Sequence, residues 1–109
     1  MYLIGYGGSM TVDGGTEYNN FIQTVSENTG VLNSGYYSNP EADRLGFEAS
    51  QEMSPVFRLK LLQEGFQIAL VDDIAYVPLF NWDIIILTAN NVIFSPHAER
   101  MIVKDIKFT

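Results

Sequence analysis

The sequence predicts a small α+β domain, a fragment of an α/β-type lobe, with three helices and a small mixed sheet. Apolar residues recur at helical spacing in the first two thirds of the chain, where Asn39–Pro40 and Ser54–Pro55 mark two helix starts. Beyond Ala75 the chain becomes rich in β-branched and aromatic residues, which favour strands. We therefore predict a helical portion, 1–75, and a strand portion, 76–109.

Composition and charge exclude several classes of protein. A chain of 109 residues, 47% of them hydrophobic, is long and apolar enough for one folded domain rather than a disordered tail. Its net charge of −7 disfavours nucleic acid and anionic membranes as partners, because both reward clustered lysine and arginine. The sequence has no cysteine, which excludes disulfides and thiolate sites, and no apolar run of membrane-spanning length.

A buried strand is predicted over 2–6, because this segment is short, apolar and aromatic. Gly7, Gly8 and Ser9 follow at once, and a glycine loop after a strand lets backbone N–H groups approach a ligand closely. The loop matches neither of the glycine-rich phosphate-binding motifs nor the G-x-S-x-G motif of a nucleophilic serine. A tight turn is therefore the simpler interpretation, and a ligand-facing loop is the alternative.

A helix near 17–26 is predicted next. Its apolar residues fall at positions i, i+3, i+4 and i+7, which share one face of a helix: Tyr18, Phe21, Ile22 and Val25. Thr16 is the predicted N-cap, and Gly30 can adopt the left-handed conformation that ends a helix. Residues 26–38 are rich in Asn, Ser and Gly and indicate a loop.

The second helix, predicted over 40–51, has a strong start. Asn39 can accept an orphan backbone N–H, and the proline after it suits the first helical position. Glu41 and Asp43 then lie near the positive end of the helix dipole. Its apolar face consists of Ala42, Leu45 and Ala49. Close packing against another element would explain why Gly46 is tolerated within it.

The third helix, predicted over 55–72, repeats this kind of start at Ser54. Arg58 lies near its beginning and is predicted to be an ion-pair partner rather than a ligand contact. Asp72 and Asp73 oppose the dipole at its end. Solvent exposure or pairing with a base is favoured over a metal site, because adjacent acids seldom converge on one ion.

Strands are predicted over 76–80, 83–88 and 102–108. Ile84–Leu87 shows no alternation of apolar and polar residues, which predicts burial on both faces. Asn90–Asn91 is a candidate turn.

Three further side chains are candidates for a site. Tyr36 and Tyr37 could line a pocket, although packing against the following helix is the favoured alternative. His97, the only histidine, has no serine or cysteine partner at a motif spacing, so a surface position is favoured over a catalytic base. No cofactor and no metal are expected.

The order of these elements resembles that of a known family. The chain presents Tyr-Ser-Asn-Pro-Glu-x-Asp, then Ser-Pro-x-x-Arg, two acids, and Val-Pro-Leu-Phe. This order resembles the C-terminal part of family 5 extracellular solute-binding proteins, which are the receptors of peptide, nickel and related ABC importers. The matching residues are Asn39, Pro40, Asp43, Arg58, Asp72 or Asp73, Pro78 and Leu79. Each element is common alone, whereas the ordered set is much more specific.

The resemblance implies a fold and a function. It spans most of the chain, and family members are several times longer. We therefore expect this chain to be a C-terminal fragment of such a protein. The fold implied is the periplasmic-binding-protein-like II fold, of which this chain would form part of the C-terminal lobe. The function implied is capture of a peptide or similar small solute between two lobes for delivery to an ABC permease, with no catalysis. The other expected partner is the remaining N-terminal lobe of the same receptor, and the chain is expected to self-associate when that lobe is missing. The expected location is periplasmic or extracellular.

The resemblance also implies ligand-binding residues, namely Tyr6, Gly7, Gly8, Ser9, Asp13 and Trp82. In peptide-binding members an acidic residue near the glycine loop takes the ligand's amino group. Ser9 stands nearest to that place here, with Asp13 and Glu17 further along, and this departure puts an amine ligand in doubt. Two alternatives from other classes stay open, a small hydrolase using Ser9, His97 and a carboxylate, or a stand-alone protein-interaction module.

Overall fold

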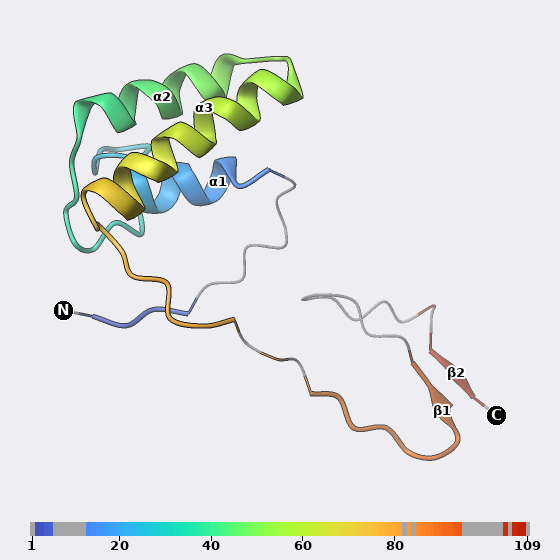
Figure 1. The fold of residues 1–109 in the computed structure, drawn as a ribbon. Coiled ribbons are helices and arrows are strands. Elements are labelled where there is room, and N and C mark those ends of the chain that lie inside the picture. The colour runs from blue at the N-terminus through green and yellow to red at the C-terminus, as the bar shows by residue number, and fades with distance from the viewer. Residues whose placement is uncertain are drawn as a thin grey trace. The chain divides into compact units, whose positions relative to one another are not determined.

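Three helices make up most of the first part of the chain that the structure describes (Figure 1). The computed structural model describes residues 2–5, 13–81, 83, 85–94, 104 and 106–108. The elements are α1 (Gly15–Glu17) with its π-helical continuation η1 (Tyr18–Ile22), α2 (Pro40–Gln51), α3 (Pro55–Gln67) with its continuation η2 (Ile68–Asp72), β1 (Val92–Ile93) and β2 (Lys107–Phe108). They fall into two units, Met1–Pro78 and Leu79–Thr109.

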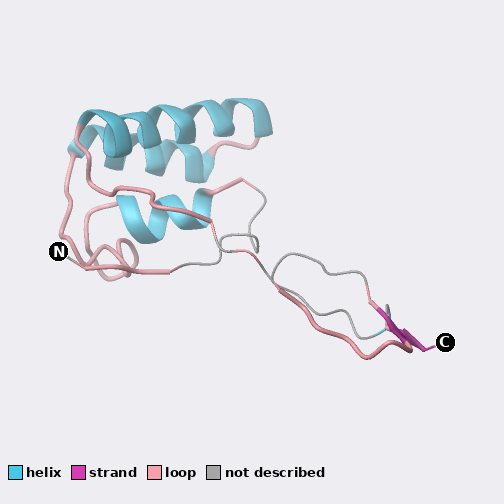
Figure 2. Cartoon of the chain, turned by 60° about the horizontal axis from the view of Figure 1, so that its bottom comes forward, coloured by secondary structure: helices cyan, strands magenta, loops and turns pink. Residues whose placement is uncertain are grey.

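The predicted α+β class is confirmed, because the described residues form three helices and a two-stranded antiparallel sheet. The helices predicted over 40–51 and 55–72 have the observed bounds, the latter as α3 followed by η2. Figures 1 and 2 show α2 and α3 lying side by side, with the first helix against them.

The first helix is shorter than the predicted 17–26, because it ends at Ile22. Gln23 is extended (φ −65°, ψ 148°). The next residue is held by another element, since the backbone N–H and hydroxyl of Thr24 donate to the Asp43 carboxylate at 2.8 and 2.6 Å. The predicted apolar face is therefore only partly buried, with Val25 42% exposed.

The predicted start of that helix is also wrong. Thr16 lies inside the helix, and no side chain caps it from the N-cap position, Gly14. Instead Asp13 accepts the Gly15 N–H at 2.9 Å through its carboxylate. Gly30 does adopt the predicted left-handed conformation (φ 66°), but in the loop beyond the helix end.

Tyr18 forms the centre of the helical core and is 1% exposed. The absent side chains of Gly46 on α2 and Gly65 on α3 make room for its ring. A Cβ at Gly46 would lie 2.5 Å from Tyr18 Cε1, and one at Gly65 would lie 2.6 Å from Cζ, both too close for real atoms. Close packing thus explains Gly46, as predicted, and the predicted face of α2 (Ala42, Leu45, Ala49) is fully buried.

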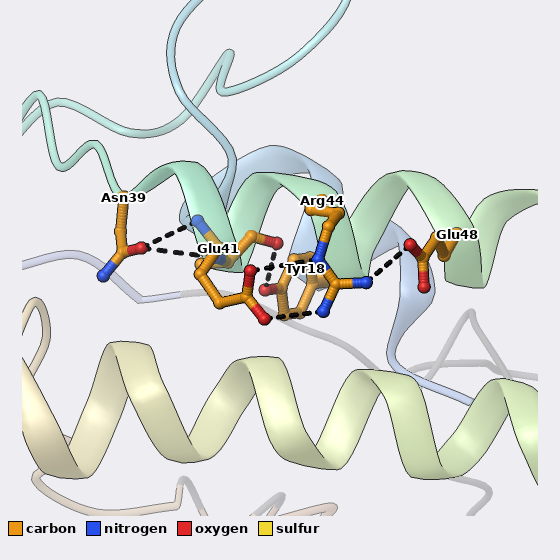
Figure 3. Close-up of polar contacts among 6 residues, drawn as sticks. Tyr18, Asn39, Glu41, Arg44 and Glu48 are labelled. Atoms are coloured by element: carbon orange, nitrogen blue, oxygen red, sulfur yellow. Dashed lines mark hydrogen bonds and ion pairs between the residues drawn. The ribbon is translucent and has the colours of Figure 1, made fainter.

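The predicted cap of α2 is confirmed (Figure 3). Asn39 Oδ1 accepts the backbone N–H groups of Glu41 and Ala42 at 2.9 and 3.4 Å. The start of α3 is less complete than predicted, because Pro55 is in place but the Ser54 side chain makes no capping bond. The Ser54 backbone N–H donates to Glu52 Oε1 at 2.7 Å.

Replacing Asn39 by alanine should lower the free energy of unfolding by about 1 kcal/mol, because two N–H groups of the first turn lose their acceptor. Ser54→Ala is the matched control, since its side chain caps nothing and the change should be close to neutral. Urea unfolding of the two variants checks this. An equal loss in both variants would show that the Asn39 cap contributes nothing special.

The strand predictions are mostly wrong. Residues 2–5, 76–80 and 85–88 form no strand, and the only strand pairing in the described residues joins Val92 to Phe108 and Ile93 to Lys107. A strand needs a neighbouring backbone as hydrogen-bond partner, and the described residues supply none to these segments. The structure does not describe Tyr6, Trp82, Ile84, residues 95–103 or Asp105.

The predicted two-sided burial of Ile84–Leu87 is also wrong for the described residues. Ile85 is 82% exposed and Leu87 is 93% exposed. The run has strand-like composition, but burial needs a second layer, which the described part of this unit does not provide. The turn predicted at Asn90–Asn91 is confirmed, since the Val92 N–H donates to the Ala89 carbonyl at 2.9 Å.

Candidate functional site

Asp13 is the only predicted ligand-binding residue that the structure describes. Tyr6, Gly7, Gly8, Ser9 and Trp82 lie outside the described residues, and so does His97.

Asp13 is bound to Arg58 of α3, which confirms the prediction that Arg58 is an ion-pair partner. Arg58 Nε donates to Asp13 Oδ2, while the other carboxylate oxygen accepts the Gly15 N–H. Arg58 Nη1 donates to the Ala49 carbonyl near the end of α2. One guanidinium thus connects α2 and α3 to the residue just before the first helix. The Arg58 side chain is 26% exposed and the Asp13 side chain is 36% exposed.

These contacts hold the pKa of Asp13 below its ordinary value of 3.8. The largest cause is the hydrogen bond from Arg58, followed by the backbone N–H of Gly15. Asp13 is consequently ionised at neutral pH with its charge compensated inside the protein. It does not offer a free carboxylate to a ligand amine.

Asp13→Asn should reduce stability at neutral pH by less than about 1 kcal/mol, because the ion pair is partly exposed and asparagine can still accept the Gly15 N–H. A carboxylate whose pKa is lowered on folding stabilises the protein above its ordinary pKa and loses that effect as pH falls through the folded-state pKa. The gap between wild type and variant should therefore shrink below pH 3.8, as urea unfolding at several pH values would measure. A gap that does not change with pH would contradict this assignment.

A cavity of about 250 Å³ lies beside the guanidinium of Arg58. Residues of all three helices line it, among them Thr16, Gln23 and Ser50. Gln23 is buried, with 8% of its surface exposed. This arrangement can hold a small polar group. Within the described residues no three His, Cys, Asp or Glu side chains are grouped as a metal site would require.

A second hollow, of about 270 Å³, lies between the loop after the first helix and α2. Four of its polar side chains are hydrogen-bonded in two pairs. Thr24 donates to Asp43 at 2.6 Å, and the hydroxyls of Ser26 and Thr29 share a hydrogen bond at 2.7 Å. These groups hold the loop in place and leave little for a ligand.

A buried polar network that the sequence did not predict surrounds Asn33, which is 1% exposed. Its Nδ2 donates to the carbonyls of Gln23 and Tyr37 at 3.0 and 2.8 Å. Its Oδ1 accepts the Tyr37 N–H at 3.0 Å and the Tyr76 hydroxyl at 3.2 Å, and Tyr2 donates to Tyr76. The sequence offers no pattern that singles out Asn33, since its loop is rich in similar residues.

Asp73 is exposed, as predicted, but its partners are not bases. The Tyr37 hydroxyl and Asn39 Nδ2 both donate to Asp73 Oδ2 at 2.7 Å. The first of these bonds is the larger cause of a lowered Asp73 pKa. Tyr37 thus packs against the helical core, which confirms the favoured alternative, whereas Tyr36 is 79% exposed.

Comparisons with protein-family models, with curated proteins and with solved structures found no match to this chain. Among the described helices, none combines the length and the apolar character needed to cross a bilayer.

Proposed function

We propose that this chain is part of the substrate-binding component of an ABC importer, which captures a peptide or similar small solute between two lobes and delivers it to the permease. The observation that carries the proposal is the ordered motif set of a family 5 solute-binding protein, which runs from Asn39-Pro40 through Arg58 to Pro78-Leu79. No single part of the set is specific, whereas the order of the parts is much more so.

The roles of these residues support the proposal. Asn39 caps α2 and also donates to Asp73, so two parts of the motif set are in contact. Asp43 holds the chain where the first helix ends. Arg58 binds Asp13, directly after the predicted ligand loop. The contacts of these residues thus fix the frame of the helical unit.

We further propose that this chain forms part of the C-terminal lobe of a periplasmic-binding-protein-like II fold. Large apolar side chains are exposed in the segment that follows the helices, among them Val77, Leu79, Ile85 and Leu87. Exposed apolar surface of this extent is typical of a face that another layer covers. We assign that layer to the remaining N-terminal lobe of the receptor.

Capture by such a receptor needs binding energy and closure of two lobes, and no bond is made or broken. The proposed ligand contacts remain Tyr6, Gly7, Gly8, Ser9 and Trp82. Asp13 has a different role in this proposal, because its charge is already paired with Arg58. The preferred solute is therefore one that does not depend on a carboxylate to hold its amino group, and the place of action is periplasmic or extracellular.

Uptake by a strain that lacks the gene tests the proposal. We expect the deletion strain to lose uptake of labelled short peptides, and the intact gene to restore it. Unchanged uptake of peptides and nickel chelates in the deletion strain would contradict the proposal, and turnover of a solute that Ser9→Ala abolishes would show an enzyme instead.

A further inference from the structure

We propose that the cavity beside Arg58 binds a carboxylate, with the Arg58 guanidinium and the Gln23 carboxamide as donors. The cavity lies where the first helix, α2 and α3 meet and measures about 250 Å³. Ligand pockets usually start at about 300 Å³, so this one fits a terminal group rather than a whole peptide. Its role toward a peptide rests on the proposed function, whereas its affinity for a carboxylate does not.

Arg58 supplies the positive charge. A guanidinium has five N–H donors in a planar fork that matches a carboxylate. Two are used, by Nε toward Asp13 and by Nη1 toward the Ala49 carbonyl. Nη2 lies against Gly15, in space that a Cβ there would take, and it has no hydrogen-bond partner among the described residues. Both Arg58 and Gly15 line the cavity, so this unused edge is available to a bound anion.

Gln23 supplies the second donor, a neutral carboxamide that is not part of the Arg58–Asp13 ion pair. It lines the same cavity, and the residue as a whole is 8% exposed. Its Nε2 occupies the space that a Cβ on Gly46 would fill. The described part of the chain offers this carboxamide no hydrogen-bond partner. Its amide group is therefore available to donate to a carboxylate oxygen in the cavity.

The rest of the lining favours an anion over a cation. No carboxylate lines the cavity, and its other polar side chains are Thr16, Asn19 and Ser50. Asp13, which contacts Arg58, is outside the lining and is already paired with that guanidinium. The lining therefore offers a ligand cation no carboxylate, whereas a ligand carboxylate would meet one charged and one neutral donor.

Titration of the whole chain with sodium acetate, followed by amide NMR, tests the pocket, with sodium chloride at equal ionic strength as the reference. We expect saturable shifts at the Gly15 and Gly46 amides and at Arg58 Nε. Arg58→Gln should weaken acetate binding by about tenfold or more, because a charged hydrogen bond is lost. Arg44→Gln, which removes an exposed arginine outside the lining, should leave it unchanged.

A second variant and a second ligand pair complete the test. Gln23→Leu leaves the Asp13 ion pair intact and should also weaken binding, so the result does not depend on how well Arg58→Gln folds. N-acetyl-dialanine should bind and its C-terminal amide should not. Acetate binding without N-acetyl-dialanine binding would remove the peptide role and keep the carboxylate pocket. Shifts equal to those with chloride, or acetate affinity unchanged in both variants, would overturn the proposal, whatever the uptake experiment shows.

Discussion

Tyr18→Ala is expected to lower the free energy of unfolding by about 3–5 kcal/mol, the range for loss of a large buried aromatic side chain. The ring fills the slot between Gly46 and Gly65, and Phe66 contacts it edge-on with ring centroids 5.0 Å apart. No neighbour can refill that space, because both glycines lack side chains. Since small domains are stable by only about 5–15 kcal/mol, much of this unit should unfold.

Two controls separate the parts of this effect. Tyr18→Phe keeps the ring and loses only the hydroxyl, which donates to the Ala42 carbonyl at 2.8 Å, so we expect a cost of about 1 kcal/mol. Tyr36→Ala removes a tyrosine that is 79% exposed and should be close to neutral. Urea unfolding followed by circular dichroism measures all three. Similar losses in Tyr18→Ala and Tyr36→Ala would contradict a core built around Tyr18.

Asn33→Leu should lower the free energy of unfolding by about 3 kcal/mol or more, because several buried groups lose their partners together. The carbonyls of Gln23 and Tyr37 lose a donor, and the Tyr37 N–H and Tyr76 hydroxyl lose an acceptor. Leucine has a similar size but can satisfy none of them. The loop, the first helix and the segment after η2 should therefore separate more easily.

Asn28→Leu is the matched control for Asn33→Leu, because Asn28 lies in the same loop and is exposed. Thermal unfolding gives the stability of both variants, and hydrogen exchange at the Tyr37 amide reports the local opening. We expect faster exchange at Tyr37 in Asn33→Leu alone. Equal stability of the two variants would mean that the Asn33 hydrogen bonds contribute no net stability.

The helices were predictable because their determinants are local. Asn39 and the proline after it mark a start that needs no distant partner, and the apolar spacing of α2 identified its buried face. The end of the first helix was not predictable, because it depends on Asp43 capturing Thr24 from a distant part of the sequence. The strands failed for a related reason, since strand composition alone does not supply the backbone that a strand pairs with.

The candidate site was predictable only in part. Arg58 was identified as an ion-pair partner from its place in the helix, but the sequence did not identify Asp13 as that partner. The role of Gln23 depends on Gly15 and Gly46, which open the cavity and come from separate elements. Such a pocket is a property of helix packing, and no pattern within one segment reports it.

The central claim is that this chain supplies one part of a solute site whose other part is a second lobe. Light scattering combined with calorimetric titration of peptides and nickel chelates tests it most directly. The exposed apolar segment that includes Ile85 and Leu87 predicts self-association, and an open half-site predicts weak binding or none. A clean monomer that binds one solute at micromolar affinity or better would contradict the claim.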